Sequence, residues 1–216
     1  MTNIRYNGKI QFKMTMQIKI SNGPISYKYA ENYLEKRVKK VKDGKADELL
    51  WILEHPTTFT AGVRYTKDEI LDKKIIIIQT KRGGKITLHN PGQKIIYFVL
   101  NLNYRKKDIR NLVRVIEKSI IEFLKNYNIA GKADKNKIGI WVKNNKIAAI
   151  GIRVTRWVAY YGCSININNN LNEYKKIIPC GLSNKKITSI FKEKRVKVKE
   201  VNKNLKKIFE YNLDKV

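Results

Sequence analysis

The sequence predicts an α+β fold in which a mixed β-sheet is flanked by helices. Three observations support this class: short apolar or alternating runs typical of strands, three longer segments with helical spacing, and no strict alternation of strand and helix. A chain of 216 residues can bury one full core and contains no low-complexity linker. We therefore predict a single domain over residues 1–216, with residues 1–14 as a flexible N-terminal extension.

The first half of the chain predicts four strands and one helix. The run MTMQIKIS alternates as a strand does, and residues 26–41 carry apolar and tyrosine side chains at helical spacing, Tyr29 among them. Compact apolar runs predict three buried strands, namely ELLWILEHP, IIIIQT at residues 75–80, and KIIYFVLNL. The last run follows the loop KRGGKITLHNPGQ, whose glycines permit backbone angles that side chains exclude.

The second half begins with the strongest helix pattern of the chain. Asp108 can cap this helix, and apolar residues recur at steps of three and four from Ile109 to Tyr127, which predicts core packing. The runs IGIWV and KIAAIGIRV, joined by the polar turn KNN, predict a hairpin, and WVAYYGCSINI predicts a third strand. A basic helix at about residues 198–211 should close the chain.

The net charge of +28 raises the question of nucleic-acid binding. Lysine outnumbers arginine 36 to 10, however, and the lysines are spread from end to end rather than clustered. We therefore expect no specific nucleic-acid site. The positive field should instead speed encounter with acidic partners, including acidic proteins.

Several features predict a cytoplasmic location. The longest apolar runs are far shorter than the roughly 20 residues that cross a bilayer, so no membrane span is expected. The N-terminus lacks the apolar stretch of a secretory signal, and two cysteines in the whole chain agree with a reducing compartment.

Cys180 is the first candidate functional residue. It lies between Pro179, which fixes one flank, and Gly181, which frees the other. A thiol on a rigid turn among lysines can act as a nucleophile once its pKa is lowered. A small buried hydrophobic role is the alternative, and the residues by themselves leave both open.

A second candidate is the loop that contains Arg82, Gly83, Gly84, Thr87 and His89. It gathers a cation, two flexible glycines, a hydroxyl and one of the two histidines, a combination typical of ligand sites. Ordinary turn glycines and a structural histidine remain the alternative. Lys146, at the start of KIAAIG, is one lysine among 36, and the residues alone favour a solvated turn lysine, although its strand should run into the middle of the sheet.

Five segments, in this order, resemble one known family, the lipoyl(octanoyl) transferases. They are LEHPTTFTAGVR (53–64), RGGKITLHNPGQ (82–93), KIAAIG (146–151), YGCSINI (161–167) and IIPCGLSNKKITSI (177–190). Each motif is weak alone, but their joint occurrence is specific. The resemblance implies a fold like that of biotin and lipoate ligases. It also implies transfer of an octanoyl group from acyl carrier protein, through a thioester on Cys180 with Lys146 as its partner, to a lysine of a lipoyl domain.

The resemblance further implies which residues bind the substrate. An apolar tunnel beside the RGG loop would hold the acyl tail, with Gly83, Gly84, His89 and Gly151 as wall candidates. The matching motifs place the substrate-binding residues at Arg82, Gly83, Gly84, Thr87, His89, Ala149, Ile150, Gly151, Tyr161, Gly162 and Cys163. Backbone amides around Gly151 or Gly181 are the candidates for stabilising the developing oxyanion, and the sequence does not choose between them.

The resemblance also implies the partners. The donor would be octanoyl-acyl carrier protein. The acceptors would be lipoyl domains of 2-oxoacid dehydrogenases and the glycine cleavage H protein. We expect a monomer with no cofactor, no metal, no specific nucleic acid and no membrane.

This chain departs from the family pattern at two places. Tyr161-Gly162 stands where the family usually has His-Gly, and Asn90 stands in HNPGQ where HGPGQ is usual. A tyrosine does no imidazole chemistry near pH 7, so it cannot replace a histidine acid or base. We interpret Cys163, beside this motif, as small wall packing rather than a second nucleophile.

Three other functions remain alternatives. An ATP-dependent lipoate or biotin ligase of the same fold would need a nucleotide site and no cysteine nucleophile. A basic nucleic-acid-binding protein would need basic and aromatic residues concentrated on one face. An inactive homologue that only holds acylated carriers would be compatible with Tyr161.

Overall fold

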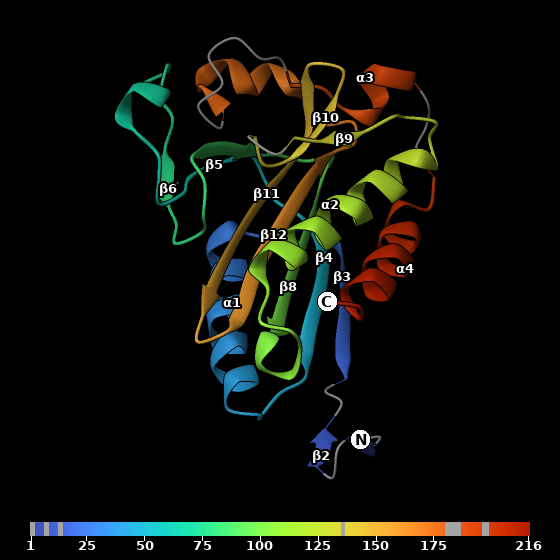
Figure 1. The fold of residues 1–216 in the computed structure, drawn as a ribbon. Coiled ribbons are helices and arrows are strands. Elements are labelled where there is room, and N and C mark those ends of the chain that lie inside the picture. The colour runs from blue at the N-terminus through green and yellow to red at the C-terminus, as the bar shows by residue number, and fades with distance from the viewer. Residues whose placement is uncertain (1–2, 7–8, 13–14, 135–136, 180–186, 196–198) are drawn as a thin grey trace.

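The computed structural model describes residues 3–6, 9–12, 15–134, 137–179, 187–195 and 199–216 (Figure 1). For residues 3–6 and 9–12 it describes the backbone. These two segments are β1 (Asn3–Tyr6) and β2 (Lys9–Phe12), which pair as an antiparallel hairpin.

A seven-stranded mixed sheet forms the centre of the molecule (Figure 1). Its strand order is β3-β4-β8-β12-β11-β10-β9, in which β3 and β4 run parallel and the other neighbouring pairs are antiparallel. The predicted α+β class with a mixed sheet is therefore confirmed. The strands are β3 (Met16–Pro24), β4 (Glu48–Glu54), β8 (Gln93–Asn101), β9 (Lys132–Ala133), β10 (Ile140–Val142), β11 (Asn145–Thr155) and β12 (Val158–Asn166).

Helices cover both faces of this sheet. On one face lies α1 (Tyr27–Lys42), and on the other lie α2 (Ile109–Lys125) and α4 (Val201–Leu213) (Figure 1). Successive side chains of a strand point to opposite faces. In β4, Leu50 and Ile52 accordingly pack in the α2 and α4 core, whereas Leu49 and Trp51 pack in the α1 core. Burial on both faces is why this strand is a continuous apolar run.

The predicted helix after Asp108 is confirmed as α2. The Asp108 carboxylate accepts a hydrogen bond from the backbone N–H of Asn111 at 2.9 Å, which satisfies one free donor of the first turn. Its apolar stripe is buried in the core, at Leu112, Ile116, Ile120, Phe123 and Leu124. At about 1.5–3 kcal/mol for each large apolar side chain, this burial fixes the helix against the sheet.

A smaller sheet lies beside one end of the main sheet. Its order is β6-β5-β7, made of β6 (Ile77–Gln79), β5 (Thr58–Ala61) and β7 (Ile86–His89). It packs with the single-turn segment η3 (Leu171–Lys176) through a separate apolar cluster. The remaining short helical elements are η1 (Lys67–Glu69), η2 (Leu102–Tyr104) and α3 (Ile190–Lys194).

One expectation for the apolar segments is wrong. The run at residues 75–80 is not a buried strand, because β6 is a three-residue strand at the edge of the small sheet and Ile76 is 86% exposed. The helix predicted at residues 26–41 is confirmed as α1, which turns Ala30, Leu34 and Val38 toward the sheet and leaves Tyr29 55% exposed.

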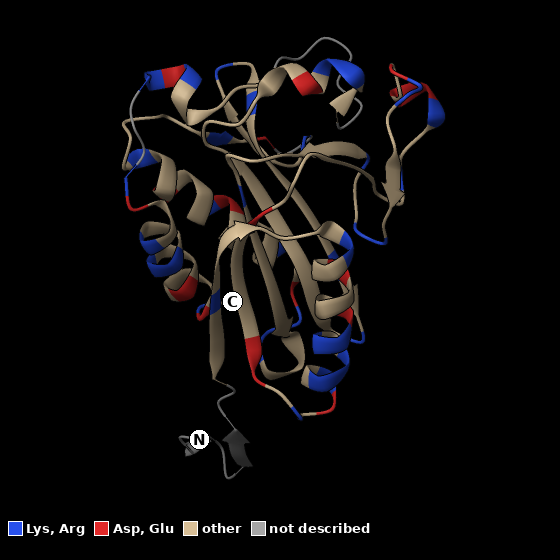
Figure 2. Cartoon of the chain, turned by 180° about the vertical axis from the view of Figure 1, so that it is seen from behind, with Lys and Arg blue, Asp and Glu red and all other residues tan. Residues whose placement is uncertain are grey.

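The positive charge is distributed over the whole molecule. Figure 2 shows Lys and Arg segments on helices at both sides of the sheet and on the loops at its ends. This distribution differs from the single basic face expected of a nucleic-acid site. In the described part of the chain no helix has the length and apolar character needed to cross a membrane.

Candidate active site

A cavity of about 420 Å³ lies where the loop between β6 and β7 meets β11 and β12. It brings together segments that are far apart in the sequence. Twelve of the predicted site residues line it: Arg82, Gly83, Gly84, Thr87, His89, Lys146, Ala149, Ile150, Gly151, Tyr161, Gly162 and Cys163. Their roles remain predictions, but their placement around one cavity agrees with a common site.

The cavity is cationic. Five of its lining residues are Lys or Arg, and none of the lining residues that the structure describes is Asp or Glu. Arg64 and Lys137 are exposed, so they mark the mouth of the cavity, whereas Lys146 is buried within it. Such a site favours an anionic reacting group, since a buried positive charge stabilises a negative one.

The Lys146 side chain on β11 packs against Trp141 of the neighbouring strand β10. Its ammonium nitrogen lies 5.4 Å from the centre of the Trp141 ring, within cation–π distance. Trp141 is fixed in turn, because its indole Nε1–H donates to the backbone oxygen of Lys137 at 3.0 Å. The aromatic face thus supports a buried ammonium group that would otherwise lose its solvation without compensation.

Gly139 provides the space that the Lys146 side chain occupies. A Cβ atom at position 139 would lie 2.4 Å from Cε and 3.1 Å from Nζ of Lys146. Its φ of +129° is also a conformation that only glycine adopts readily. Gly139 therefore sets where the ammonium group can be.

Replacing Gly139 with alanine should slow the predicted acyl transfer by up to about 10²-fold, because the added methyl displaces Lys146 from its position. Pre-steady-state acylation rates measure this effect. Gly44→Ala is the matched control, since Gly44 also has positive φ, of +67°, but has nothing within 4 Å of its Cβ position. Equal rate losses in the two variants would show that backbone strain, and not displacement of Lys146, is responsible.

The predicted nucleophile, Cys180, lies outside the described residues. The residues on either side of residues 180–186 are described, and both adjoin Lys146. Pro179 and Ile187 line a smaller cavity together with Lys146, and Thr188 N–H donates to the Lys146 carbonyl at 2.9 Å. The chain therefore enters and leaves the cysteine segment beside Lys146, which supports the predicted pairing of Lys146 with Cys180.

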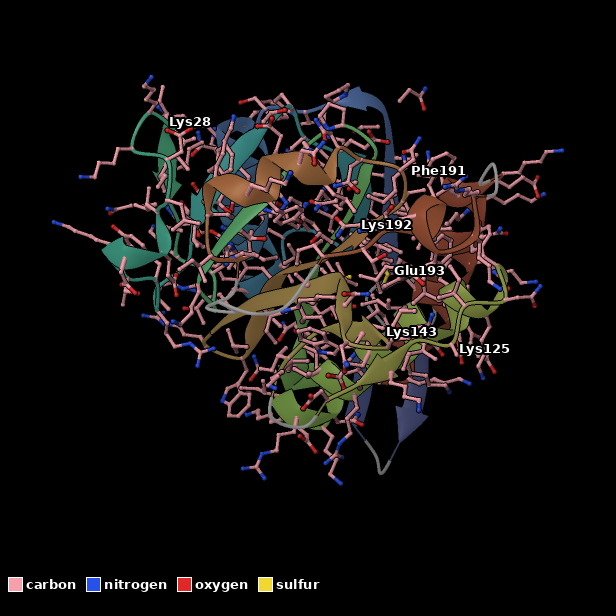
Figure 3. The ribbon with its side chains drawn as sticks, turned by 90° about the horizontal axis from the view of Figure 1, so that it is seen from above. Lys28, Lys125, Lys143, Phe191, Lys192 and Glu193 are labelled. Atoms are coloured by element: carbon pink, nitrogen blue, oxygen red, sulfur yellow. The ribbon has the colours of Figure 1, made fainter. Side chains whose placement is uncertain are left out.

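The downstream residues lead into α3. Seen from above, α3 with Phe191, Lys192 and Glu193 lies at the same end of the molecule as Lys143 in the turn between β10 and β11 (Figure 3). The Thr188 hydroxyl donates to the Glu193 carboxylate at 2.6 Å. This contact anchors the segment beside Lys146 to α3.

Arg82 fixes the glycine loop in place. Its Nη2 donates to the carbonyl and the hydroxyl oxygen of Thr60 at 2.9 and 2.8 Å, and its Nη1 donates to the Gly83 carbonyl at 3.0 Å. The loop then closes on β11, where a Cβ atom at Gly151 would lie 3.2 Å from the Gly83 carbonyl oxygen. Gly151 thus permits the close approach that forms this wall.

His89 lies in a buried polar network. Its Nδ1–H donates to the Gln93 side-chain oxygen at 2.8 Å, which leaves Nε2 as the acceptor side of the ring. The ring lies 5.6 Å from His55, whose Nδ1–H donates to the Ile25 carbonyl and whose Nε2 accepts from the Tyr97 hydroxyl at 2.9 Å. Burial lowers the pKa of His55 to about 4 and, together with the charges of His55 and Arg82, that of His89 to about 3.

These two histidines should make the fold sensitive to acid. Because each folded-state pKa lies below the unfolded value of about 6.5, the unfolded chain binds more protons, and stability falls as pH drops below 6.5 toward 4 and 3. Each histidine should remove about 2 kcal/mol of unfolding free energy at pH 5. Urea unfolding at pH 7.5 and pH 5 tests this, with His55→Gln losing less stability than the wild type. The same pH dependence in both proteins would contradict it.

Tyr161 is turned toward α1. Its hydroxyl donates to the Glu31 carboxylate at 2.8 Å, and burial followed by this hydrogen bond raises the pKa of the phenol well above its ordinary value. A phenol that stays protonated and paired does not act as a base. Tyr161 also has a φ of +67°, a strained conformation for a bulky residue in a strand, which sets the shape of the cavity wall.

Cys163 is a buried free thiol in the wall of the cavity. Burial raises its pKa well above the ordinary range, which disfavours the thiolate. This geometry supports the interpretation of Cys163 as wall packing.

Sequence reasoning missed several lining residues. Trp141 was predicted only as part of a strand, and Val113 only as part of the helix stripe, but both line the cavity. Among His, Cys, Asp and Glu side chains of the described residues, no group of three or more is placed to bind a metal ion.

Comparison with known proteins places this site in context. The family model of the lipoyl protein ligase A/B catalytic domain matches residues 26–210. An octanoyltransferase of Wolbachia pipientis wMel is 46% identical over 197 residues, which cover 88% of this chain and 96% of that protein.

Two solved structures share the fold. A lipoate-protein ligase A bound with ATP superposes with a TM-score of 0.77 at 15% identity, covering 93% of this chain and 86% of the other. A biotin protein ligase from Aquifex aeolicus gives 0.53 at 15% identity, covering 94% and 70%. The predicted resemblance to biotin and lipoate ligases in fold is thereby confirmed. The chain belongs to the lipoyl protein ligase A/B catalytic domain family.

Proposed function

We propose that this protein is an octanoyltransferase of lipoate biosynthesis. It moves an octanoyl group from acyl carrier protein to a lysine of a lipoyl domain through a thioester on Cys180. The observation that carries this proposal is the cavity with Lys146 inside it and with both flanks of the Cys180 segment beside Lys146. Relatives named octanoyltransferase support the choice of the acyl group.

The reaction requires two displacements. In the first, the Cys180 thiolate attacks the octanoyl thioester carbonyl, and the phosphopantetheine thiol of the carrier leaves and takes up a proton. In the second, the neutral amine of the acceptor lysine attacks the Cys180 thioester, an amide forms, and the cysteine thiol is released. The first exchange is nearly balanced in energy, whereas the second runs downhill. Cysteine thus holds the acyl group between two bulky partners that cannot dock together.

Lys146 assists both steps. Its ammonium group stabilises the Cys180 thiolate before the first attack and gives a proton to the departing phosphopantetheine thiolate. The resulting amine can then accept a proton from the attacking lysine. Tyr161, with its phenol paired to Glu31, has no part in this proton transfer.

The apolar part of the cavity binds the octanoyl tail. Gly83, Gly84, His89 and Gly151 form its wall, and six methylenes at ~0.8 kcal/mol each would contribute roughly 5 kcal/mol of binding. The cationic mouth suits acidic partners. The partners would be octanoyl-acyl carrier protein as donor, and the lipoyl domains of 2-oxoacid dehydrogenases and the glycine cleavage H protein as acceptors. The protein would act in the cytoplasm as a monomer of one catalytic domain over residues 1–216, without a cofactor.

Intact-mass spectrometry tests the proposal directly. After incubation with octanoyl-acyl carrier protein, the protein should gain one octanoyl group, and peptide mapping should place it on Cys180. Adding a lipoyl domain should then remove it without ATP. A protein that acylates the lipoyl domain only when ATP and free octanoate are supplied would be a ligase, and the proposal would be wrong.

A further inference from the structure

Among the described residues, no segment pairs with the outer edge of β11 over a short stretch that lines the cavity. β10 pairs with β11 only as far as Ala148, opposite Ile140. The next contact on this edge is with the glycine loop, at Ile152, whose carbonyl accepts a hydrogen bond from the Gly83 N–H at 3.1 Å. Ile150 lies between these two contacts and lines the cavity.

The direction of the backbone groups follows from this pattern. In an antiparallel strand the N–H and C=O of one residue point to the same side, and those of the next residue to the other. The Ile152 carbonyl faces away from β12, so the Ile150 amide does too, whereas Gly151 faces β12 opposite Gly162. Within the described residues the Ile150 N–H has no backbone partner.

The Ile150 amide and the Lys146 side chain belong to the same cavity, and Gly139 relates the two positions. The position of a Cβ atom at Gly139 is 3.1 Å from Lys146 Nζ and 2.6 Å from the Ala148 carbonyl oxygen. Ala148 and Ile150 are two residues apart on the same edge of β11. An N–H donor with no backbone partner among the described residues therefore lies in the same cavity as Lys146, a buried cation of β11.

We infer that the Ile150 N–H donates the hydrogen bond that stabilises the oxyanion of the acyl transfer. When a sulfur or amine attacks, the thioester C=O becomes C–O⁻, and it reforms as the thiolate leaves, so no further reactant is needed. A fixed donor aimed at this oxygen stabilises the charge where it develops. This role rests on the proposed function, and it excludes the Gly151 amide, which the strand ladder uses.

Changing the Ile150 amide bond to an ester, with an α-hydroxy acid at position 150, tests the role because it replaces only the N–H by oxygen. Loss of one oxyanion donor should slow acylation of Cys180 by about 10²–10³-fold with the KM for octanoyl-acyl carrier protein unchanged. The matched control is the same ester at Val154, which lies on the same edge with the same parity and does not line the cavity. Each ester also makes the carbonyl of the preceding residue a weaker hydrogen-bond acceptor. In both variants this carbonyl faces β12, so the two esters should perturb the sheet to the same extent.

Nuclear magnetic resonance gives a second, independent test on the unmodified chain. Ala149-Ile150 is the single Ala-Ile pair in the sequence, so ¹³C′-alanine and ¹⁵N-isoleucine labelling yields one carbonyl-correlated amide signal, that of Ile150. On octanoylation this proton should shift downfield and exchange more slowly with solvent. An adduct seen by mass with no change in that signal would contradict the role.

The outcomes separate the two claims. Equal acylation rates in the two esters, or a loss confined to KM, would overturn the role of Ile150 while leaving octanoyl transfer intact. A wild-type protein that takes up no octanoyl group would overturn the proposed function, and the role of Ile150 with it.

Discussion

Replacing Cys180 with alanine is expected to lower octanoyl transfer by roughly 10⁴-fold or more, since removal of a covalent nucleophile leaves only binding and charge stabilisation. The variant should gain no octanoyl mass from octanoyl-acyl carrier protein. Octanoylated lipoyl domain, quantified by mass spectrometry in a single-turnover assay, measures the rate. The second thiol of the chain, Cys163, is buried and burial raises its pKa, so it should not replace Cys180 as the nucleophile.

Cys163→Ala is the control for this experiment. It removes the other thiol from the cavity wall and should retain the adduct and most of the transfer rate, because a neutral buried thiol contributes packing only. Loss of the adduct in Cys163→Ala, with transfer intact in Cys180→Ala, would reverse the assignment of the nucleophile.

Replacing Lys146 with alanine should slow acylation of Cys180 by about 10²–10⁴-fold, the range typical of a general acid or base. Affinity for the octanoyl carrier should change little, because the ammonium group lies inside the cavity whereas the cations of its mouth, Arg64 and Lys137, stay in place. Rapid-quench acylation kinetics and carrier titration, measured on the same preparation, separate the two effects.

Lys143→Asn provides the matched control, because it removes an exposed lysine three residues earlier. Asparagine tolerates the φ of +54° found at that turn, so the backbone should not change. Wild-type rates in this variant would show that loss of charge in general does not explain the effect at Lys146. If Lys146→Ala lost carrier affinity and acylation rate to the same extent, Lys146 would be a binding residue and not the partner of the thiolate.

Part of the fold could be read from local pattern alone. The strand runs around Leu50 and Ile96, the helix capped by Asp108, and the hairpin that carries Lys146 were all predicted with nearly their observed bounds. Period-two and period-3.6 spacing are imposed by the backbone itself, so they are visible without knowledge of the neighbours. Where burial depends on position in a sheet, this reasoning was wrong: Ile76 carries an apolar side chain but lies at an edge.

The candidate site shows the same division. Resemblance in five motifs pointed to Arg82, His89, Lys146 and Tyr161 as parts of one site, and the structure places them around one cavity. The resemblance gave no indication that Gly139 and Trp141 hold Lys146, because these contacts join β11 to the neighbouring segment of the chain. The fixed neutral state of His89 likewise depends on His55, 34 positions earlier, and on the depth of burial that the fold imposes.

By itself, the sequence determined the order and type of the main elements, the excess of positive charge, and the family motifs with their cysteine and lysine. Only the tertiary structure decided that the motif segments share a cavity, that Tyr161 is bound to Glu31, and that the Ile150 amide faces away from β12 whereas that of Gly151 faces it. The physical reason is that spacing along a chain fixes which face a side chain takes. The register of paired strands, made by hydrogen bonds between distant residues, fixes which backbone groups remain available for chemistry.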